Sequence, residues 1–189
     1  MFRYFVTYLS KGENNPLEVV PHVELEKYLA KWYEITHLPA KFQDGCNETT
    51  ATYTLSKDGS ISVLNQATKN GKIKQAKGKV VDKNSNAKLK VTFFWPFYGD
   101  YWIIKLGNDY IYSVVGTPNR KYLWILSRTP QMDDKLYSLL IGYVKSKGFD
   151  VSKLIKLFKR HEARTIQADA GIASAQEPEN SEYLTLINI

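Results

Sequence analysis

The sequence predicts an all-β protein: an eight-stranded antiparallel up-and-down barrel with one C-terminal α-helix packed outside and a short ninth strand. Short segments with alternating apolar and polar residues recur from residue 30 to residue 128, as expected for strands that bury one face. Turn-forming residues separate these segments, and a single stretch after residue 133 has helical spacing instead. Eight strands that close on themselves leave no free edge and can enclose a small ligand.

Turn signals set the limits of the predicted strands. Asp58-Gly59 and Asn70-Gly71 readily adopt positive φ and predict tight hairpins, and residues 84–86, 108–109 and 117–119 predict further turns. Residues 22–29 are expected to form a short helical turn before the first strand. We place the strands at residues 30–37, 48–56, 61–65, 73–82, 89–93, 101–105, 110–115 and 122–128. Because Pro96 cannot serve a central strand, residues 95–99 are predicted to be a loop.

The segment after residue 133 predicts an amphipathic helix. Asp133 is a suitable N-cap and Gly148 a suitable stop. The expected apolar stripe, which should pack on the outside of the barrel, comprises Leu136, Leu139, Leu140, Tyr143 and Val144. Residues 149–158 should then form the ninth strand.

Composition divides the chain into three parts. Residues 1–21 are rich in Gly, Asn and Pro and are expected to form a poorly packed N-terminal arm, residues 22–160 the barrel domain, and residues 161–189 an acidic, flexible tail. The net charge is +7, but no Lys or Arg follows Arg164. The Lys residues are scattered, so we interpret them as a solvated surface.

Several function classes are disfavoured by the residue types present. Cys46 is the only cysteine, so no intrachain disulfide can form. The three histidines, His22, His37 and His161, are scattered, and neither metal-ligand spacing nor a Gly-rich phosphate loop occurs. We therefore predict no catalytic residues, metal or cofactor. Because strand alternation sends most aromatic rings inward, a nucleic-acid surface is not expected either.

Trp32 and Arg128 are predicted to close one end of the barrel. Trp32 stands at the head of the series of strands, and Arg128 ends the eighth. An Arg can lay its planar guanidinium on an indole face and use its remaining donors on carbonyl groups.

The order of eight strands, a helix and a short strand resembles the lipocalins, and the motifs agree. Ala30-Lys31-Trp32 is similar to the Gly-x-Trp motif of that family with Ala in place of Gly, and Arg128 matches its closing Arg. The closer resemblance is to the Blc-type group, which contains bacterial outer-membrane lipocalins, plant temperature-induced lipocalins and apolipoprotein D. The resembling stretches, which run from about residue 23 to 158, include residues 28–35, 51–55, 63–66, 87–91, 99–102, 122–130 and 148–153.

The resemblance implies a ligand cavity inside the barrel, and strand alternation agrees on which residues face it. If Phe93 points inward, so do Leu89 and Val91. If Trp124 points inward, so do Tyr122 and Leu126. The positions that line the pocket in similar lipocalins are Tyr53, Asn65, Phe93, Tyr101, Tyr112 and Trp124. Lys69, on the turn after the third strand, is a candidate partner for an anionic headgroup.

The predicted function is binding, storage or transport of a small amphiphilic lipid, a fatty acid or lysophospholipid, in membrane or envelope maintenance. The alternative is a planar ligand such as haem, a tetrapyrrole or a steroid stacked on Trp124 or Trp102. The expected partners are the ligand and a membrane surface, with the chain a monomer or homodimer. The resemblance implies a periplasmic or outer-membrane location. The N-terminal residues show no convincing signal peptide or lipid-bearing Cys, so a cytoplasmic location is the alternative expectation.

Overall fold

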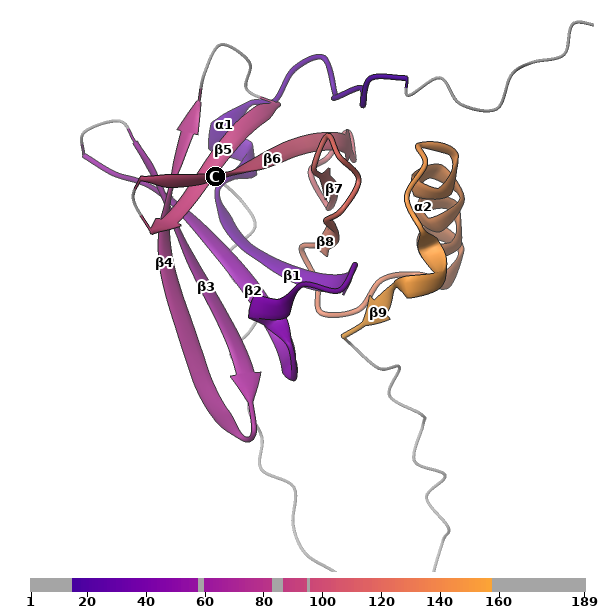
Figure 1. Ribbon diagram of the computed structural model, residues 1–189. Coiled ribbons are helices and arrows are strands. Elements are labelled where there is room, and N and C mark those ends of the chain that lie inside the picture. The colour runs from indigo at the N-terminus through magenta and orange to yellow at the C-terminus, as the bar shows by residue number, and fades with distance from the viewer. Residues whose placement is uncertain (1–14, 58–59, 83–86, 95, 158–189) are drawn as a thin grey trace, which may run out of the picture.

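The computed structural model describes residues 15–57, 60–82, 87–94 and 96–157, with only the backbone described at residues 81–82 and 93–94. All eight predicted strands are present, and Figure 1 shows them wrapped into one barrel with helix α2 beside it. The strands are β1 Ala30–His37, β2 Cys46–Leu55, β3 Ile61–Lys69, β4 Lys72–Asp82, β5 Lys88–Phe94, β6 Phe97–Leu106, β7 Tyr112–Gly116 and β8 Leu123–Ser127. The remaining elements are α1 Leu25–Tyr28, η1 Lys41–Gln43, α2 Asp134–Ser146, η2 Val151–Lys153 and β9 Ile155–Lys156.

The predicted closed antiparallel barrel is confirmed by the strand pairing. Strands β2 to β8 pair in chain order, β8 pairs with β1, and β1 returns to β2. Because β2 pairs only with the first half of β1, the second half of that edge is left for β9, which pairs with Thr36 and His37. The barrel therefore has no long exposed edge along β1.

Several element limits differ from the predicted ones. Strand β3 runs to Lys69 and not to residue 65, so Lys69 belongs to the strand and not to the turn after it. Three other differences have a local cause. Residues 97–99 belong to β6 and not to a loop, because Pro96 occupies the turn between the paired residues Phe94 and Phe97, where its missing N–H is not needed. Strand β7 begins at Tyr112, since Tyr110 has a φ of +59° and belongs to the preceding turn. The ninth strand is only two residues long, since the Asp150 carboxylate accepts a bond from the Ser152 amide and starts a 3-10 turn instead.

Two of the predicted hairpin turns and both chain ends lie outside the described residues. The turns are those at residues 58–59 and 84–86, and the ends include the whole tail 161–189. Residues 15–21, the described part of the N-terminal arm, are better packed than predicted. Leu17 is only 4% exposed, and the Val20 amide donates to the Ile103 carbonyl at 2.9 Å.

Helix α2 covers the outer face of β6, β7 and β8, as predicted. The Asp133 carboxylate caps its first turn by accepting from the Lys135 and Leu136 amides, and Gly148 ends it with a φ of +87°. Leu140 and Val144 are buried against outward apolar side chains of the three strands, which are apolar on both faces for this reason. Leu139, predicted to belong to the buried stripe, is instead exposed.

Trp32 and Arg128 stack at one end of the barrel. The Arg128 guanidinium carbon lies 3.7 Å from the centroid of the fully buried Trp32 ring. The same guanidinium donates to the carbonyl oxygens of Lys27 at 2.6 Å, Leu29 at 2.8 Å and Lys31 at 3.0 Å, and to that of Tyr110 at 3.2 Å. Arg128 therefore ties the end of α1, the start of β1 and the β6–β7 turn to the Trp32 ring.

Ala30 explains why glycine suits the first position of the Gly-x-Trp pattern. Its φ is +71°, in the left-handed region that a residue with a Cβ adopts at a cost of about 1–2 kcal/mol. The side chain is exposed. The sharp turn from α1 into β1 therefore carries backbone strain. Because the Ala30 side chain is exposed, its burial does not compensate for that strain.

We expect Trp32→Ala to lower the free energy of unfolding by about 3–5 kcal/mol, because it empties a fully buried site. Arg128→Lys should also destabilise the protein, since an ammonium cannot both stack on the ring and reach four carbonyl groups. Denaturant unfolding measures both. Lys105→Ala, which removes a cation from the half-buried Tyr143 ring, is the control. Unchanged stability in both variants would contradict this account.

Ala30→Gly should raise the free energy of unfolding by roughly 0.5–1 kcal/mol, because glycine adopts the observed φ without strain. This net value allows for the greater conformational entropy that glycine gives the unfolded chain. Thermal unfolding would show the gain as a higher Tm. A Tm below that of the wild type would mean that the left-handed conformation at residue 30 is not strained.

Candidate functional site

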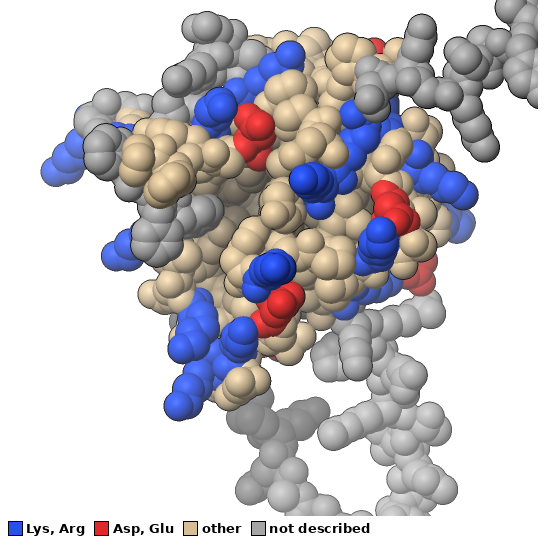
Figure 2. All heavy atoms as spheres, in the orientation of Figure 1, with Lys and Arg blue, Asp and Glu red and all other residues tan. Residues whose placement is uncertain are grey.

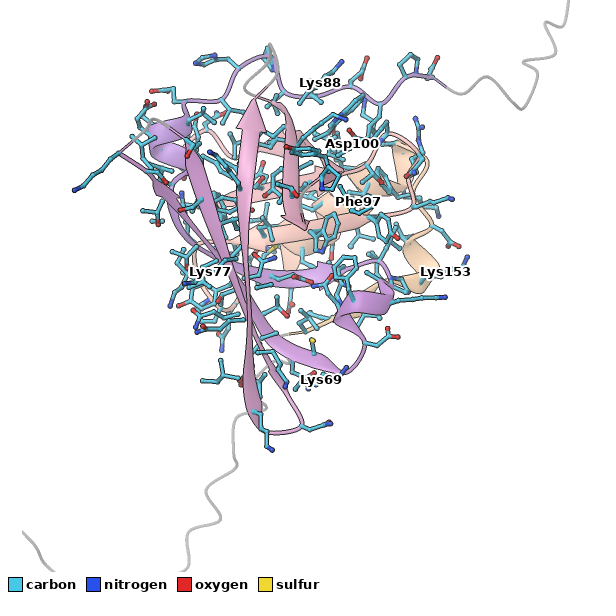
Figure 3. The ribbon with its side chains drawn as sticks, turned by 60° about the vertical axis from the view of Figure 1, so that its left-hand side comes forward. Lys69, Lys77, Lys88, Phe97, Asp100 and Lys153 are labelled. Atoms are coloured by element: carbon cyan, nitrogen blue, oxygen red, sulfur yellow. The ribbon has the colours of Figure 1, made fainter. Side chains whose placement is uncertain are left out.

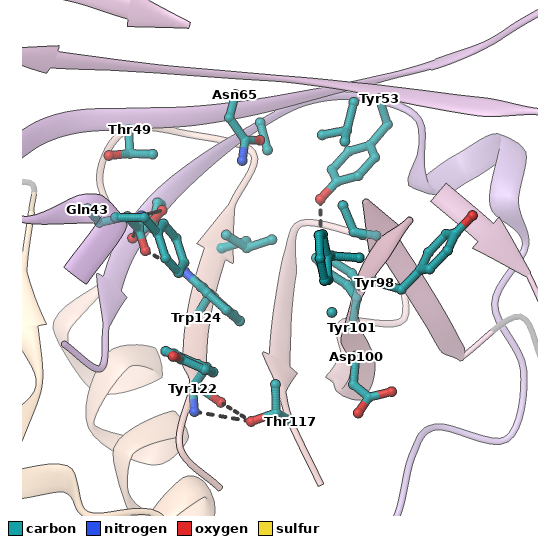
Figure 4. A pocket seen from close by; sticks show the side chains of 18 residues that line it. Gln43, Thr49, Tyr53, Asn65, Tyr98, Asp100, Tyr101, Thr117, Tyr122 and Trp124 are labelled. Atoms are coloured by element: carbon teal, nitrogen blue, oxygen red, sulfur yellow. Dashed lines mark hydrogen bonds between the residues drawn. The ribbon is translucent and has the colours of Figure 1, made fainter. Parts of the chain in front are cut away.

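The barrel encloses a cavity of about 410 Å³ that opens between η1 and the start of β6. Its walls are formed by inward-facing residues of β1, β2, β3, β5, β6 and β8. Aromatic and aliphatic side chains predominate, with a few polar groups among them. This size and composition are typical of sites for small hydrophobic ligands. Figure 4 shows the lining side chains.

Four of the predicted ligand-binding residues line the cavity together: Tyr53, Asn65, Tyr101 and Trp124 (Figure 4). Strand alternation also places Val91, Tyr122 and Leu126 in the lining, as predicted from Phe93 and Trp124. The side chain of Phe93 itself lies outside the described residues.

Tyr112 and Lys69 do not line the cavity. Tyr112 packs on the outward face of β7 with the cluster beneath α2, because its neighbour Ser113 takes the inward position. Trp102, the other ring considered for a planar ligand, belongs to the same outward cluster. Lys69 ends β3 and pairs with Lys72 toward the far end of the β3–β4 hairpin, beyond the cavity wall (Figure 3).

Three tyrosines form a hydrogen-bonded group at the closed end of the cavity. The Tyr101 hydroxyl lies 2.9 Å from the hydroxyls of both Tyr28 and Tyr53, and Tyr28 also lies 2.9 Å from Ser113 Oγ. Burial raises the pKa of Tyr28 to about 12, although bonds with Ser113 and Tyr101 partly offset it. The hydroxyls are thus neutral and satisfied by one another, and the closed end presents ring surface to a ligand.

Glu34, Gln43 and Trp124 form a second polar group in the cavity wall. Gln43 Nε2 donates to both Glu34 oxygens at 3.1 and 3.0 Å, and Trp124 Nε1 donates to Gln43 Oε1 at 3.0 Å (Figure 4). Because an indole N–H can only donate, it fixes the Gln43 oxygen toward Trp124 and the amide NH₂ toward Glu34. Gln43 therefore ties η1 to β1 and β8.

Glu34 is a buried carboxyl held in its neutral form. It is 5% exposed, and this burial raises its pKa to about 8, against the opposing effect of the Gln43 bond. His37 Nδ1 lies 3.9 Å from a Glu34 oxygen but donates to the Leu38 carbonyl at 2.9 Å. Burial also lowers the pKa of His37, so the ring is neutral and does not draw the carboxyl into its ionised form.

His37, one of the three scattered histidines, is buried at 2% exposure. Glu34, Gln43, Thr49 and the mouth residue Phe42 were not predicted as site residues at all, although the structure places them in the lining. The signal for Glu34 was present: it lies two residues after the inward Trp32 on one strand and must share its face. Gln43 carries no such signal because η1 has no strand alternation.

Large apolar side chains are exposed at the mouth of the cavity. Phe42 is 70% exposed and Phe97 is 76% exposed, and Tyr98 lies beside them in the lining. Figure 2 shows Lys and Arg side chains gathered over the β3–β4 hairpin.

None of the helices in the described ranges has the length and apolarity needed to span a bilayer. Within the same ranges, His, Cys, Asp and Glu do not gather in threes at metal-binding distance.

Comparison with known proteins identifies close relatives. A family model described as a lipocalin-like domain matches residues 23–159. Temperature-induced lipocalin-1 of Arabidopsis thaliana is 40% identical over 180 residues, covering 89% of this chain and 92% of the relative. The outer membrane lipoprotein Blc of Escherichia coli K12 is 40% identical over 141 residues, with 72% and 80% covered, and apolipoprotein D of Mus musculus is 34% identical over 164 residues, with 77% and 85% covered.

A solved structure supports the fold. Insecticyanin from the tobacco hornworm Manduca sexta superposes with a TM-score of 0.63 at 21% identity, over 78% of this chain and 87% of that chain.

Replacing Glu34 by Gln should change the pH dependence of stability. Between pH 4.5 and about 8 the unfolded carboxyl is ionised while the folded one keeps its proton, so the wild type loses stability as pH rises, by about 1.4 kcal/mol per unit at most. Below pH 4.5 both states are protonated and this contribution vanishes. Glu34→Gln should therefore be stabilised relative to the wild type increasingly from pH 5 to pH 8.

Urea unfolding of the two proteins across that range would measure the difference. Glu26→Gln, which removes the same charge from the exposed face of α1, is the matched control. A constant difference between Glu34→Gln and the wild type at all pH values would show that the buried carboxyl is ionised in the folded protein.

Proposed function

The chain belongs to the lipocalin family, whose members bind small hydrophobic ligands, and we propose that its barrel binds and carries a small amphiphilic lipid such as a fatty acid or lysophospholipid. One observation carries this proposal. The cavity is closed at one end by Trp32 and the tyrosine group and open at the other through an apolar mouth. Such a cavity receives an elongated apolar group and leaves its polar end near solvent.

The closed end favours an acyl chain. The hydroxyls of Tyr53 and Tyr101 bond to each other at 2.9 Å, so their rings, rather than free polar groups, meet a ligand that reaches the bottom. Burial of a chain contributes about 0.8 kcal/mol for each CH₂ group removed from water. The tail therefore supplies most of the affinity, and the polar end selects among ligands with the same tail.

A charged headgroup is expected outside the cavity. The described lining contains the acidic residues Glu34 and Asp100 but neither Lys nor Arg. An anionic headgroup would thus lie at the mouth, where exposed Phe42 and Phe97 flank the opening and Lys69 is within the neighbouring hairpin. Lys69 does not line the cavity, and we propose that it contacts the headgroup outside the mouth.

Exchange of the ligand with a membrane surface fits the same features. Two exposed phenylalanines at the mouth can enter the interfacial layer, and the lysines gathered over the β3–β4 hairpin favour anionic lipid. Several relatives are named outer membrane lipoproteins, while another is a plant lipocalin. We infer a role in membrane maintenance from the lipid cavity and these relatives, with binding rather than catalysis as the activity.

One observation supports a planar ligand as the second candidate. Tyr122 and Trp124 lie in the same wall with centroids 6.0 Å apart and ring planes within 17° of parallel, which forms a flat aromatic surface. Haem, a tetrapyrrole or a steroid could lie on it. A visible absorption band after purification would favour a tetrapyrrole, and native mass spectrometry would separate a steroid from an acyl lipid by mass.

We expect Ala51→Phe to abolish or strongly weaken lipid binding, because Ala51 lines the cavity and a benzyl group there fills the path of the ligand. Displacement of the neutral dye N-phenyl-1-naphthylamine by palmitate and by lysophosphatidylcholine measures the affinity. Thr52→Phe is the matched control, since the next residue on β2 faces away from the cavity. Equal binding by both variants would mean that the lipid binds elsewhere.

A further inference from the structure

Two of the buried polar groups in the cavity wall have no hydrogen-bond partner among the residues that the structure describes. Thr49 is 6% exposed, and its hydroxyl makes no hydrogen bond; the buried Asn65 Oδ1 makes none either. A buried polar atom without a partner costs about 1–3 kcal/mol in a folded protein, so such atoms are uncommon and call for an explanation. Both residues line the cavity, where a ligand can supply the missing bond.

Thr49 and Glu34 lie on adjacent strands and both line the cavity. Tyr33 pairs with Thr50 in antiparallel register, so the next positions along β1 and β2 are Glu34 and Thr49, and both face inward. The side chains thus share one patch of wall. Figure 4 shows Thr49 above Gln43 on the side of the cavity where Trp124 bonds to Gln43.

The neutral Glu34 carboxyl leaves a donor unused on this patch. Gln43 presents its NH₂ group to both carboxyl oxygens, and an NH₂ group cannot accept the carboxyl proton. Among the described residues, the Glu34 carboxyl makes only these two side-chain hydrogen bonds, and it accepts both from Gln43. Neither of these two bonds uses a carboxyl proton, so an acceptor atom of a ligand in the cavity can take one.

We propose that Glu34 and Thr49 form a polar subsite within the cavity that binds an uncharged oxygen of the ligand, and that a hydroxyl group on the lipid chain or ring is the group it selects. A hydroxyl accepts the Glu34 proton bond and exchanges a second bond with Thr49, which can donate or accept. A carboxylate is disfavoured there, because the described lining offers no Lys or Arg to neutralise it.

The subsite deepens the proposed lipid-binding function and rests on it. The proposed function requires only an apolar tail in the cavity, whereas the subsite requires a preference for one oxygen along that tail. Hydroxylated acyl lipids and hydroxylated ring lipids share this chemistry. The two requirements give separate readouts in one experiment.

The experiment measures displacement of N-phenyl-1-naphthylamine at pH 6.5 by methyl octadecanoate and by methyl esters of octadecanoic acids that carry one hydroxyl at different chain positions. All of these ligands are uncharged, so headgroup charge does not enter the comparison. At least one hydroxyl isomer should bind the wild type about two- to tenfold more tightly than the plain ester, the range expected for one added hydrogen bond.

Thr49→Val removes the hydroxyl at nearly constant volume and should reduce that preference to less than about twofold, as should Glu34→Leu. Thr50→Val is the matched control, since it makes the same change on the outward face of β2 and should keep the preference. Thr49→Val is expected to fold because it replaces a hydroxyl that makes no bond.

Dye binding without a hydroxyl preference in the wild type, or an equal preference in Thr49→Val, would overturn the subsite and leave lipid binding intact. Failure of the dye and all the esters to bind the wild type would overturn the proposed function and the subsite together. A preference for the same isomer in the wild type and Thr50→Val that is lost in Thr49→Val would support the subsite.

Discussion

The stacking of Arg128 on Trp32 is the interaction on which the closed end of the barrel depends. An apolar ring of this size closes the end only if its outer face is covered, and a guanidinium covers it while still serving backbone groups. Arg128 uses its donors on carbonyls from α1, β1 and the β6–β7 turn, which approach one another at this end. One side chain thus closes the barrel and holds together segments about one hundred residues apart in the chain.

The closed end also determines where polarity can occur inside the barrel. Above Trp32 the tyrosine hydroxyls satisfy one another, so the bottom of the cavity is apolar in effect although it contains oxygen atoms. Polarity reappears higher in the wall, at Glu34, Thr49 and Asn65, where burial leaves a neutral carboxyl and two unpartnered atoms. The cavity therefore has an apolar lower part and a polar patch part-way to the mouth, which is the arrangement an amphiphile with an internal oxygen would match.

Helix α2 accounts for another division of the aromatic residues. Strands β6 to β8 bury their outward faces beneath the helix, so rings on these strands can be buried without facing the cavity. Tyr112 and Trp102 are half-buried in this outer layer, whereas Tyr101 on β6 and Trp124 on β8 face inward. An aromatic count therefore overstates the aromatic lining of the cavity, and inward position must be decided strand by strand.

The sequence alone predicted the barrel, the external helix with its Asp133 cap and Gly148 stop, and the Trp32–Arg128 pair, because alternation, capping and turn chemistry are local and can be read along the chain. Alternation also placed Val91, Tyr122 and Leu126 in the cavity wall, whereas Tyr53, Asn65, Tyr101 and Trp124 were expected there from the resemblance to lipocalins. It did not determine the face taken by Tyr112, since apolar side chains occupy both faces of β7; the structure places Ser113 inward, where it bonds to Tyr28. Nor could it find the neutral Glu34. Burial inside the barrel raises the pKa of that carboxyl, and Gln43, whose bond opposes this effect, reaches Glu34 and Trp124 only when η1 folds over the barrel. Burial and hydrogen-bond partners are properties of the tertiary structure, and they decided which polar groups in the cavity remain free for a ligand.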